Sequence, residues 1–352
     1  MATDTELAAM RHALALARTP DLPLGPNPRV GAVIVDASGA TVGEGFHLGA
    51  GTPHAEVVAL RQAGAAARGG TVVVTLEPCN HIGRTGPCTQ ALIDAGVRRV
   101  VFAQHDLNPA ADGGTEAMRA AGVEVEDGVL AEEAEAINET WTFSVRQQRP
   151  FVTWKFAATL DGRSAAADGS ARWITGPEAR ADVHRLRASC DTVLVGTGTV
   201  EADNPRLTAR DEHDRPKPPD RQPLRVVMGH RELDPDSRVF DGSARTVVLP
   251  THDPRLALAA LYAVERQHVF LEGGPTLAAA FLSAGLVDEV IAYLAPALLG
   301  SGSHAIGDLG IRSMEQIRRF RLVEATPFGD DVRLTLRPRT PARAHLSIVE
   351  ES

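Results

Sequence analysis

The chain has 352 residues, a formal net charge of −9 at pH 7 and only three cysteines, Cys79, Cys88 and Cys190. The negative balance argues against a general binder of nucleic-acid backbones, and three cysteines are too few for a disulfide framework. The N-terminus is acidic and polar, unlike a secretory signal, and no apolar run reaches the ~18 residues of a membrane span. We therefore expect a cytoplasmic chain that acts on neither nucleic acid nor membranes and is long enough for two domains.

The first half alternates helices and strands. Apolar spacing predicts helices over residues 6–17, with Thr3 or Asp4 as cap, and over residues 54–62, 88–95 and 115–121. Short β-branched runs predict strands over residues 30–36, 41–46, 71–76, 98–103 and 123–126. A turn at Ala37-Ser38-Gly39 joins the first two strands. This order indicates a three-layer α/β domain.

Residues 54–88 carry the chemistry of this half. His54, Cys79 and Cys88 offer one imidazole and two thiolates, which suit a tetrahedral zinc ion that keeps its fourth position for water. Glu56 is placed to take a proton from zinc-bound water and to pass it to a leaving amine. His54 and Cys88 should lie at helix N-termini, where the macrodipole favours thiolate over thiol.

These residues follow the histidine-x-glutamate, proline-cysteine and second-cysteine order of the zinc-dependent deaminases. Cys79 and Cys88 are nine positions apart (88 − 79), which is wider than the usual cysteine-x-x-cysteine. The insert carries His81 and Arg84, polar groups suited to a charged ligand. A chance histidine-x-glutamate with two core cysteines is the alternative, but the order of the elements disfavours it.

The second half begins after a helical stretch over residues 130–146 and a linker over 147–150. We expect domains over residues 1–146 and 151–340 and a loose tail over 341–352. Strands are predicted over residues 151–158, 192–195, 224–228, 246–249, 268–271, 287–293 and 332–336.

Two further features of this half concern helices and phosphate. Thr175-Gly176-Pro177-Glu178 is predicted to be a capping box for a helix through Ala188. Glycines follow two strands, at 196–200 and at 272–276, where backbone amides could approach phosphates, and a helix should run from the second of these to residue 284. The polar loop over residues 204–223 is too long to be idle in a compact domain.

Taken together, the two halves resemble the bifunctional deaminase/reductases of riboflavin biosynthesis. The resemblance covers nearly everything except the tail. It is carried by the zinc set with its long insert and by Pro26-Asn27-Pro28-Arg29-Val30-Gly31, Thr159-Leu160-Asp161-Gly162-Arg163, Trp173-Ile174-Thr175, Ala202-Asp203-Asn204-Pro205 and Glu272-Gly273-Gly274-Pro275-Thr276.

This resemblance implies a cytidine-deaminase-like domain followed by a dihydrofolate-reductase-like α/β domain. The first would deaminate 2,5-diamino-6-ribosylamino-4(3H)-pyrimidinone 5′-phosphate with zinc held by His54, Cys79 and Cys88. Glu56 would carry the proton. The second would use NADPH to reduce the ribosyl group of the product to ribityl. A homo-oligomer acting on this small molecule is also expected.

The resemblance assigns further residues by position. The deaminase substrate would be held by Asn27, His47, His81 and Arg84. The phosphosugar would contact Arg187, Leu207, Arg210 and Glu272 in the reductase. The NADPH site would be lined by Ala157, Trp173, Thr199, Asp203, Gly274, Pro275 and Thr276.

Two positions depart from the family pattern. Ala171 stands where a substrate-contacting serine is frequent, and Gly229-His230 replaces an aspartate–serine whose serine touches the cofactor. His230 could instead pair with the extra phosphate of NADPH.

Two alternatives stay open. A nucleic-acid deaminase fused to an unrelated domain shares the zinc set but predicts a basic groove. A deaminase fused to a non-catalytic phosphosugar-binding domain predicts that NADPH does not bind.

Overall fold

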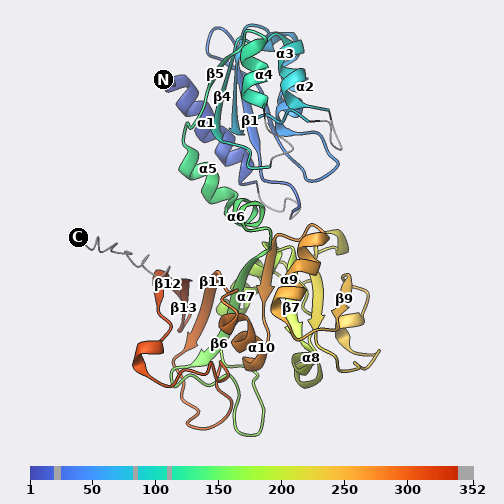
Figure 1. Ribbon diagram of the computed structural model, residues 1–352, viewed down its shortest axis with the longest axis vertical. Helices are drawn as coiled ribbons and strands as arrows, with labels where there is room; N and C mark the ends of the chain where they lie inside the picture. The colour runs from blue at the N-terminus through green and yellow to red at the C-terminus, as the bar shows by residue number, and fades with distance from the viewer. Residues whose placement is uncertain (20–24, 82–85, 109–112, 340–352) are drawn as a thin grey trace, which may run out of the picture. The chain divides into compact units, whose positions relative to one another are not determined.

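The computed structural model describes residues 1–19, 25–81, 86–108 and 113–339. The chain forms two compact units, one comprising Met1–Phe151 with Leu258–His268 and the other Val152–Ala257 with the chain from Val269 onward. Figure 1 shows the ribbon and labels most of the helices and strands. Across the described ranges, every helix is too short or too polar to traverse a bilayer.

The first unit is built on a five-stranded sheet. Its strand order is β2 (Thr41–Phe46), β1 (Gly31–Val35), β3 (Thr71–Leu76), β4 (Arg99–Gln104) and β5 (Glu124–Glu126). Strand β1 runs antiparallel to both of its neighbours, whereas β3, β4 and β5 are mutually parallel. All five predicted strands are confirmed, and so is the turn between the first two.

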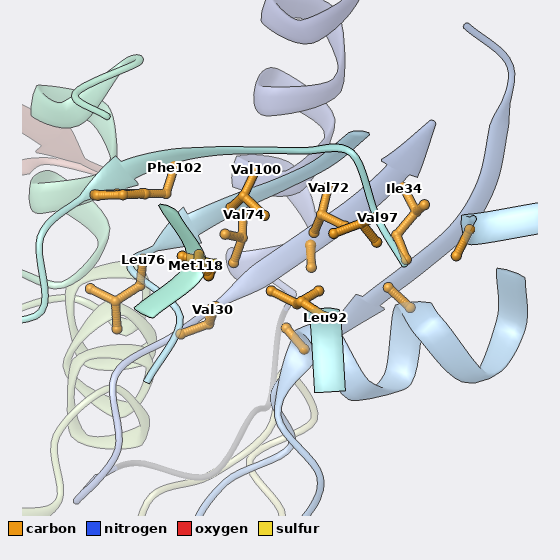
Figure 2. Close-up of a cluster of buried hydrophobic side chains, with 14 of the residues drawn as sticks. Val30, Ile34, Val72, Val74, Leu76, Leu92, Val97, Val100, Phe102 and Met118 are labelled. Carbon is orange, nitrogen blue, oxygen red and sulfur yellow. The ribbon is translucent and has the colours of Figure 1, made fainter. Parts of the chain in front are cut away.

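Helices cover both faces of this sheet. Successive side chains of a strand point to opposite faces, and Val72 and Val74 of β3 face one buried cluster while Val73 faces the other. Figure 2 shows the first of these clusters, which also takes in Leu92. On that face lie α2 (Ala55–Ala63), α3 (Cys88–Ala95) and α4 (Gly114–Ala120); on the other lie α1 (Asp4–Ala17) and α5 (Ala131–Ile137). The predicted three-layer arrangement is confirmed.

The helical stretch predicted over residues 130–146 is two helices, α5 and α6 (Glu139–Gln147). They are separated by Asn138, whose side chain accepts a hydrogen bond from the Arg29 amide at 2.8 Å and donates one to the Arg29 carbonyl at 3.0 Å. An asparagine side chain that bonds the backbone of another segment competes with helix continuation. The break therefore fixes the loop that carries Asn27.

The second unit is built on an eight-stranded sheet. Its strand order is β12 (Phe320–Phe328), β13 (Asp331–Pro338), β11 (Glu289–Ala295), β6 (Phe151–Thr159), β10 (His268–Leu271), β7 (Thr192–Gly196), β8 (Leu224–Met228) and β9 (Thr246–Leu249). Strands β10, β7, β8 and β9 are parallel, so their carboxyl ends share one edge. Such edges are where ligands bind in open α/β sheets.

The described helices of this unit are α7 (Pro177–Ala188), α8 (Thr197–Asp203) and α10 (Pro275–Ser283). Helix α9 (Pro254–Ala263) begins in this unit, and its part from Leu258 onward belongs to the first unit. Single turns of 3-10 helix occur at η1 (Gly64–Ala67) in the first unit and at η3 (Pro219–Arg221), η4 (Arg238–Phe240) and η5 (Met314–Gln316) in the second. Strand β12 and helices α8 and α9 have no counterpart among the predicted elements; α8 occupies the glycine-containing stretch at 196–200 that was expected only to approach phosphate. The side chains of β12 are mostly exposed, so its sequence lacks the alternation of apolar and polar residues that indicates a half-buried strand.

The predicted capping box before α7 is wrong. Pro177 occupies the first turn, Gly176 is the N-cap residue, and no side chain of the chain segment itself caps the helix. Instead, the Gly176 amide donates a 2.7 Å hydrogen bond to the carboxylate of Asp331, which begins β13. A residue of a distant strand therefore binds the N-cap amide, which the glutamate of the predicted capping box was expected to bind locally.

Candidate active sites

The three predicted zinc ligands come together in the first unit. His54 is the N-cap residue of α2, Cys88 opens α3, and Cys79 follows β3. His54 Nδ1 lies 3.2 Å from Cys88 Sγ and 3.5 Å from Cys79 Sγ, and the three ligand atoms lie within 4.8 Å of one another. Tetrahedral zinc bonds would set such atoms roughly 3.5–3.8 Å apart, so the donor set fits this ion.

Charge within this cluster favours a metal. A hydrogen bond from Cys88 lowers the pKa of the Cys79 thiol to about 4, and the same bond raises the pKa of Cys88. Two cysteines of a cation-binding site share one proton in this way until a cation replaces it. Both thiols are buried.

Glu56 lies on the first turn of α2, beside the cluster. It is only 4% exposed, and burial raises its pKa to about 7. A carboxyl group with a pKa near neutrality can both accept and return a proton at physiological pH.

Asn27 and His47 are joined by a hydrogen bond on the wall of the same cavity. Asn27 Nδ2 lies 2.9 Å from His47 Nε2, and His47 Nδ1 lies 3.2 Å from the carbonyl oxygen of Pro53. With Nδ1 donating to Pro53, Nε2 accepts from the Asn27 amide, and burial lowers the pKa of His47. His81 lines this cavity of about 590 Å³ together with His54, Glu56 and Cys79. Arg84 lies outside the described residues.

Two carboxylates of this cavity were missed by motif analysis. Asp106 and Glu77 both line it, and burial raises the pKa of Asp106 to about 6. Glu77 accepts hydrogen bonds from the Thr115 hydroxyl at 2.6 Å and from His105 Nδ1 at 3.0 Å. Asp106 could have been found because it lies two positions after a strand that runs parallel to the one before Cys79. His105, between that strand and Asp106, is the partner of Glu77.

A buried charge cluster marks the second unit. Arg187 on α7 donates from Nε and Nη2 to Glu272, which follows β10, and Lys155 Nζ on β6 lies 3.6 Å from the same carboxylate. Burial alone would raise the pKa of Glu272, but the charges of Arg187 and Lys155 outweigh it and bring the pKa to about 2. Lys155 was not among the predicted site residues, because a lone lysine in an apolar strand carries no motif.

All the predicted reductase residues line one cavity of about 1630 Å³. Gly274, the N-cap residue of α10, donates its amide to Thr199 Oγ1 at 3.2 Å, which links the two glycine-containing turns. The cavity is lined by Ala157, Trp173, Arg187, Thr199, Asp203, Leu207, Arg210, Glu272, Gly274, Pro275 and Thr276. His230 and Ala171, the two departures, line it as well, and the His230 ring meets that of His252 at 4.9 Å.

Comparison with known proteins matches both halves. A family model described as the cytidine and deoxycytidylate deaminase zinc-binding region matches residues 3–104, and the RibD C-terminal domain matches residues 150–334. The riboflavin biosynthesis protein RibD of Mycobacterium tuberculosis is 50% identical over 313 residues, covering 88% of this chain and 91% of that one. The chain belongs to the RibD family.

Further RibD proteins agree. The Escherichia coli protein is 42% identical, with 93% of this chain and 98% of that one covered. The solved structure of Acinetobacter baumannii RibD has a TM-score of 0.88 at 38% identity and covers 96% of this chain and 99% of that one.

As a RibD, the chain is a bifunctional enzyme of riboflavin biosynthesis. It deaminates the diaminopyrimidinone nucleotide in a zinc-dependent domain and reduces the ribosyl group of the product with NADPH in the other. Both expectations drawn from the family resemblance, the cytidine-deaminase-like first domain and the dihydrofolate-reductase-like second domain, are confirmed. A non-catalytic phosphosugar module is not supported, because residues 150–334 match the RibD reductase domain.

Proposed function

We propose the following division of roles among the residues of this RibD enzyme. The deaminase centre belongs to a domain over residues 1–146, and the reductase centre to a domain over residues 151–340. The observation that carries the first assignment is the buried carboxyl group of Glu56 beside three converging zinc donors.

In the deaminase, zinc held by His54, Cys79 and Cys88 would supply the acidity that makes a water nucleophilic near pH 7. Glu56 takes the proton of the attacking water and delivers it to the amino group, which leaves as ammonia. Its burial supports this role, because an apolar site keeps the carboxyl pKa close to neutrality.

Four polar side chains would hold the pyrimidine substrate. His47 orients Asn27 by their mutual hydrogen bond, so the Asn27 amide presents a fixed donor and acceptor to the substrate. His47, with both ring nitrogens engaged, would contact the substrate with its ring face. His81 and Arg84, carried by the insert between the cysteines, would also contact the substrate.

In the reductase, NADPH would supply the hydride. We assign the cofactor's walls to Ala157, Trp173, Thr199, Asp203, Gly274, Pro275 and Thr276. The open-chain sugar carbon receives the hydride, and its oxygen needs a proton. Lys155 is the candidate donor, because burial lowers its pKa and Glu272 holds its ammonium group in place.

The phosphosugar would be held by Arg187, Leu207, Arg210 and Glu272. Arginine side chains make charge-assisted hydrogen bonds to phosphate. Leu207 has a buried side chain packed in the core, so its contribution would come from the backbone.

Product analysis of the purified chain tests both assignments together. With the diaminopyrimidinone nucleotide alone we expect the deaminated product and ammonia; added NADPH should then yield the ribityl product. Glu56→Gln should stop the first reaction and retain zinc, whereas Lys155→Ala should stop only the second. Continued deamination by Glu56→Gln would exclude the proposed proton carrier.

We further propose a homo-oligomer that acts in the cytoplasm on the free nucleotide and not on nucleic acid. Apolar side chains exposed on the β12–β13 hairpin, Leu322, Val323 and Val332, support a subunit contact there. The charge of −9 supports the preference for a free nucleotide. Sedimentation of Leu322→Glu and assays with an RNA oligonucleotide would test the two statements.

A further inference from the structure

The long polar loop after α8 contains an ordered hairpin that lies against the reductase cavity. Backbone hydrogen bonds from Asp211 to Arg215 at 2.9 Å and from Lys217 to Ala209 at 3.0 Å close it. The backbones of Arg210 and Pro216 also form an isolated antiparallel β-bridge. We call residues 209–217 the loop hairpin.

The loop hairpin lines the cavity with Arg210 and with three carboxylates, Asp211, Glu212 and Asp214. Asp211 accepts a hydrogen bond from Arg215 Nε at 2.9 Å and Glu212 lies 3.6 Å from His213 Nε2, which leaves Asp214 to pair with Arg210. Arg210 Nη1 donates to Asp214 Oδ2 at 3.0 Å and to the Asp214 carbonyl oxygen at 3.1 Å. The Arg210 side chain is only 19% exposed, whereas that of Asp214 is 74% exposed. The buried guanidinium is therefore neutralised by a carboxylate that water can reach from most directions.

His184 faces the same carboxylate from α7. Its Nε2 lies 4.0 Å from Asp214 Oδ1, which is an ion-pair distance without a hydrogen bond. Among the described residues, its Nδ1 has no hydrogen-bond partner. His184 is one helical turn before Arg187, and both line the cavity with Arg210 and Asp214.

Other acids around the cluster are already engaged. Glu272 is bound by Arg187 and Lys155, and Arg187 Nη1 also donates to the Thr208 carbonyl oxygen at 3.3 Å. Asp214 is thus the single carboxylate within the described part of the cavity wall that pairs with Arg210 and approaches His184.

We propose that His184 is a third ligand of the substrate's 5′-phosphate, beside Arg187 and Arg210, and that Asp214 is the resident counter-ion which this phosphate displaces. The inference rests on the proposed assignment of Arg187 and Arg210 to the phosphosugar. A phosphate monoester brings a charge of about −1.5 to −2 and three acceptor oxygens, whereas Asp214 brings one charge from an exposed position. The phosphate ester should therefore bind the guanidinium groups of Arg187 and Arg210 in preference to Asp214.

We expect the protein to take up a proton when the phosphate ester binds. In the ligand-free protein, burial, followed by the charges of Arg187 and Arg210, lowers the pKa of His184 to about 4, against the opposing pull of Glu272 and Asp214. Arg187, Arg210, Glu272 and Asp214 act most strongly on the ring, from α7, the loop hairpin and the end of β10. The other charged groups that line the same cavity near these elements are Arg180, Lys155, Asp211 and Glu212. A phosphate placed among them reverses the field, so His184 takes up a proton on binding near neutral pH.

The test is calorimetric titration of the full chain with ribose 5-phosphate, with ribose as the ligand that lacks the charge. His184→Gln should weaken ribose 5-phosphate about tenfold, as expected for the loss of one charge-assisted contact. Asp214→Asn should tighten it severalfold. His184→Lys, which keeps a fixed positive charge, should restore the affinity without the proton uptake, which is read from titrations in two buffers of different ionisation enthalpy.

Matched controls lie close by in the chain. His213→Gln changes an exposed histidine at the tip of the same hairpin, and Asp220→Asn an exposed aspartate just beyond it; neither should alter the affinity. NADPH binding measured on every variant shows that the domain is folded.

The outcomes separate this inference from the assignment beneath it. If Arg210→Ala loses ribose 5-phosphate while His184→Gln binds it normally, His184 is no ligand and the inference falls alone. Weaker binding by Asp214→Asn would show that the aspartate supports the site and is not a competitor. If Arg210→Ala and Arg187→Ala also bind normally, the phosphate lies elsewhere and the proposed phosphosugar site fails.

Discussion

The two active centres of this RibD enzyme are assembled in opposite ways. The deaminase centre takes its zinc donors and Glu56 from residues 54–88, where a helix, a strand and a second helix follow one another directly. The charge cluster of the reductase takes Lys155, Arg187 and Glu272 from three elements that together span 117 positions of the chain (272 − 155). A site built from one short segment leaves a legible motif, whereas a site built by convergence of distant elements does not.

The largest expected effect is a substitution that inactivates the deaminase centre and leaves the reductase centre active. Glu56→Gln removes the proton carrier and should slow deamination by about 10²–10⁴-fold, the usual range for general acid–base catalysis. Zinc content and reduction of the already deaminated substrate should stay at wild-type levels.

The matched control is Glu132→Gln, another glutamate in the first turn of a helix, which is exposed on α5. It should leave both reactions unchanged. A parallel loss of reductase activity in Glu56→Gln would mean that the substitution damages more than one centre.

Metal removal sharpens the same contrast. Cys79→Ser should abolish stoichiometric zinc and deamination, because one of only three protein donors loses its thiolate. Cys190→Ser, which alters a buried cysteine of the other unit, should keep the zinc. Elemental analysis together with the two separate assays checks this. Full deamination by metal-free wild-type protein would contradict the zinc assignment.

Substitution in the charge cluster of Lys155, Arg187 and Glu272 should instead lower the free energy of unfolding. Glu272→Gln leaves Arg187 and Lys155 buried without their carboxylate, and breaking such a pair costs about 3–5 kcal/mol. The folded pKa of Glu272, about 2, lies below its unfolded value, so its contribution is fully present above pH 4.5 and is lost as the pH falls toward 2.

Denaturant unfolding of wild type and Glu272→Gln at pH 7, 4 and 3 measures this. The gap in unfolding free energy should be widest at pH 7 and narrow steadily on acidification. A constant gap would show that the carboxylate does not owe its stabilising role to charge.

The features that could be predicted from the sequence are those formed by residues close together in the chain. Strands β2, β3, β8, β9 and β10 and helix α3 have the bounds that the apolar patterns predicted. The zinc donors followed from the order of histidine-x-glutamate, proline-cysteine and second cysteine within one short stretch. Lys155, Asp106 and His184 were missed because each acquires its neighbours only when distant elements pack together. Spacing patterns along the sequence do not indicate contacts of this kind.

A smaller effect concerns the loop that carries Asn27. Asn138→Ala removes both hydrogen bonds to the Arg29 backbone and should cost about 1–3 kcal/mol, since the Arg29 amide loses its partner. The deaminase KM should rise, because the loop that orients Asn27 loosens, while the reductase KM stays the same. Equal changes in both KM values would argue for a general loss of structure.

The smallest effect tests the one local rule that failed. The N-cap amide of helix α7, which carries His184 and Arg187, is bound by Asp331 from 155 positions away, and the capping box that the sequence predicted is not formed. Asp331→Ala should therefore cost about 1 kcal/mol, the usual net value of one hydrogen bond, whereas Thr175→Ala should cost nearly nothing. Urea midpoints of the two variants decide between them. If Thr175→Ala were the costlier change, the local motif would hold the helix start after all, and the reductase centre would depend less on convergence than the contacts of Asp331 indicate.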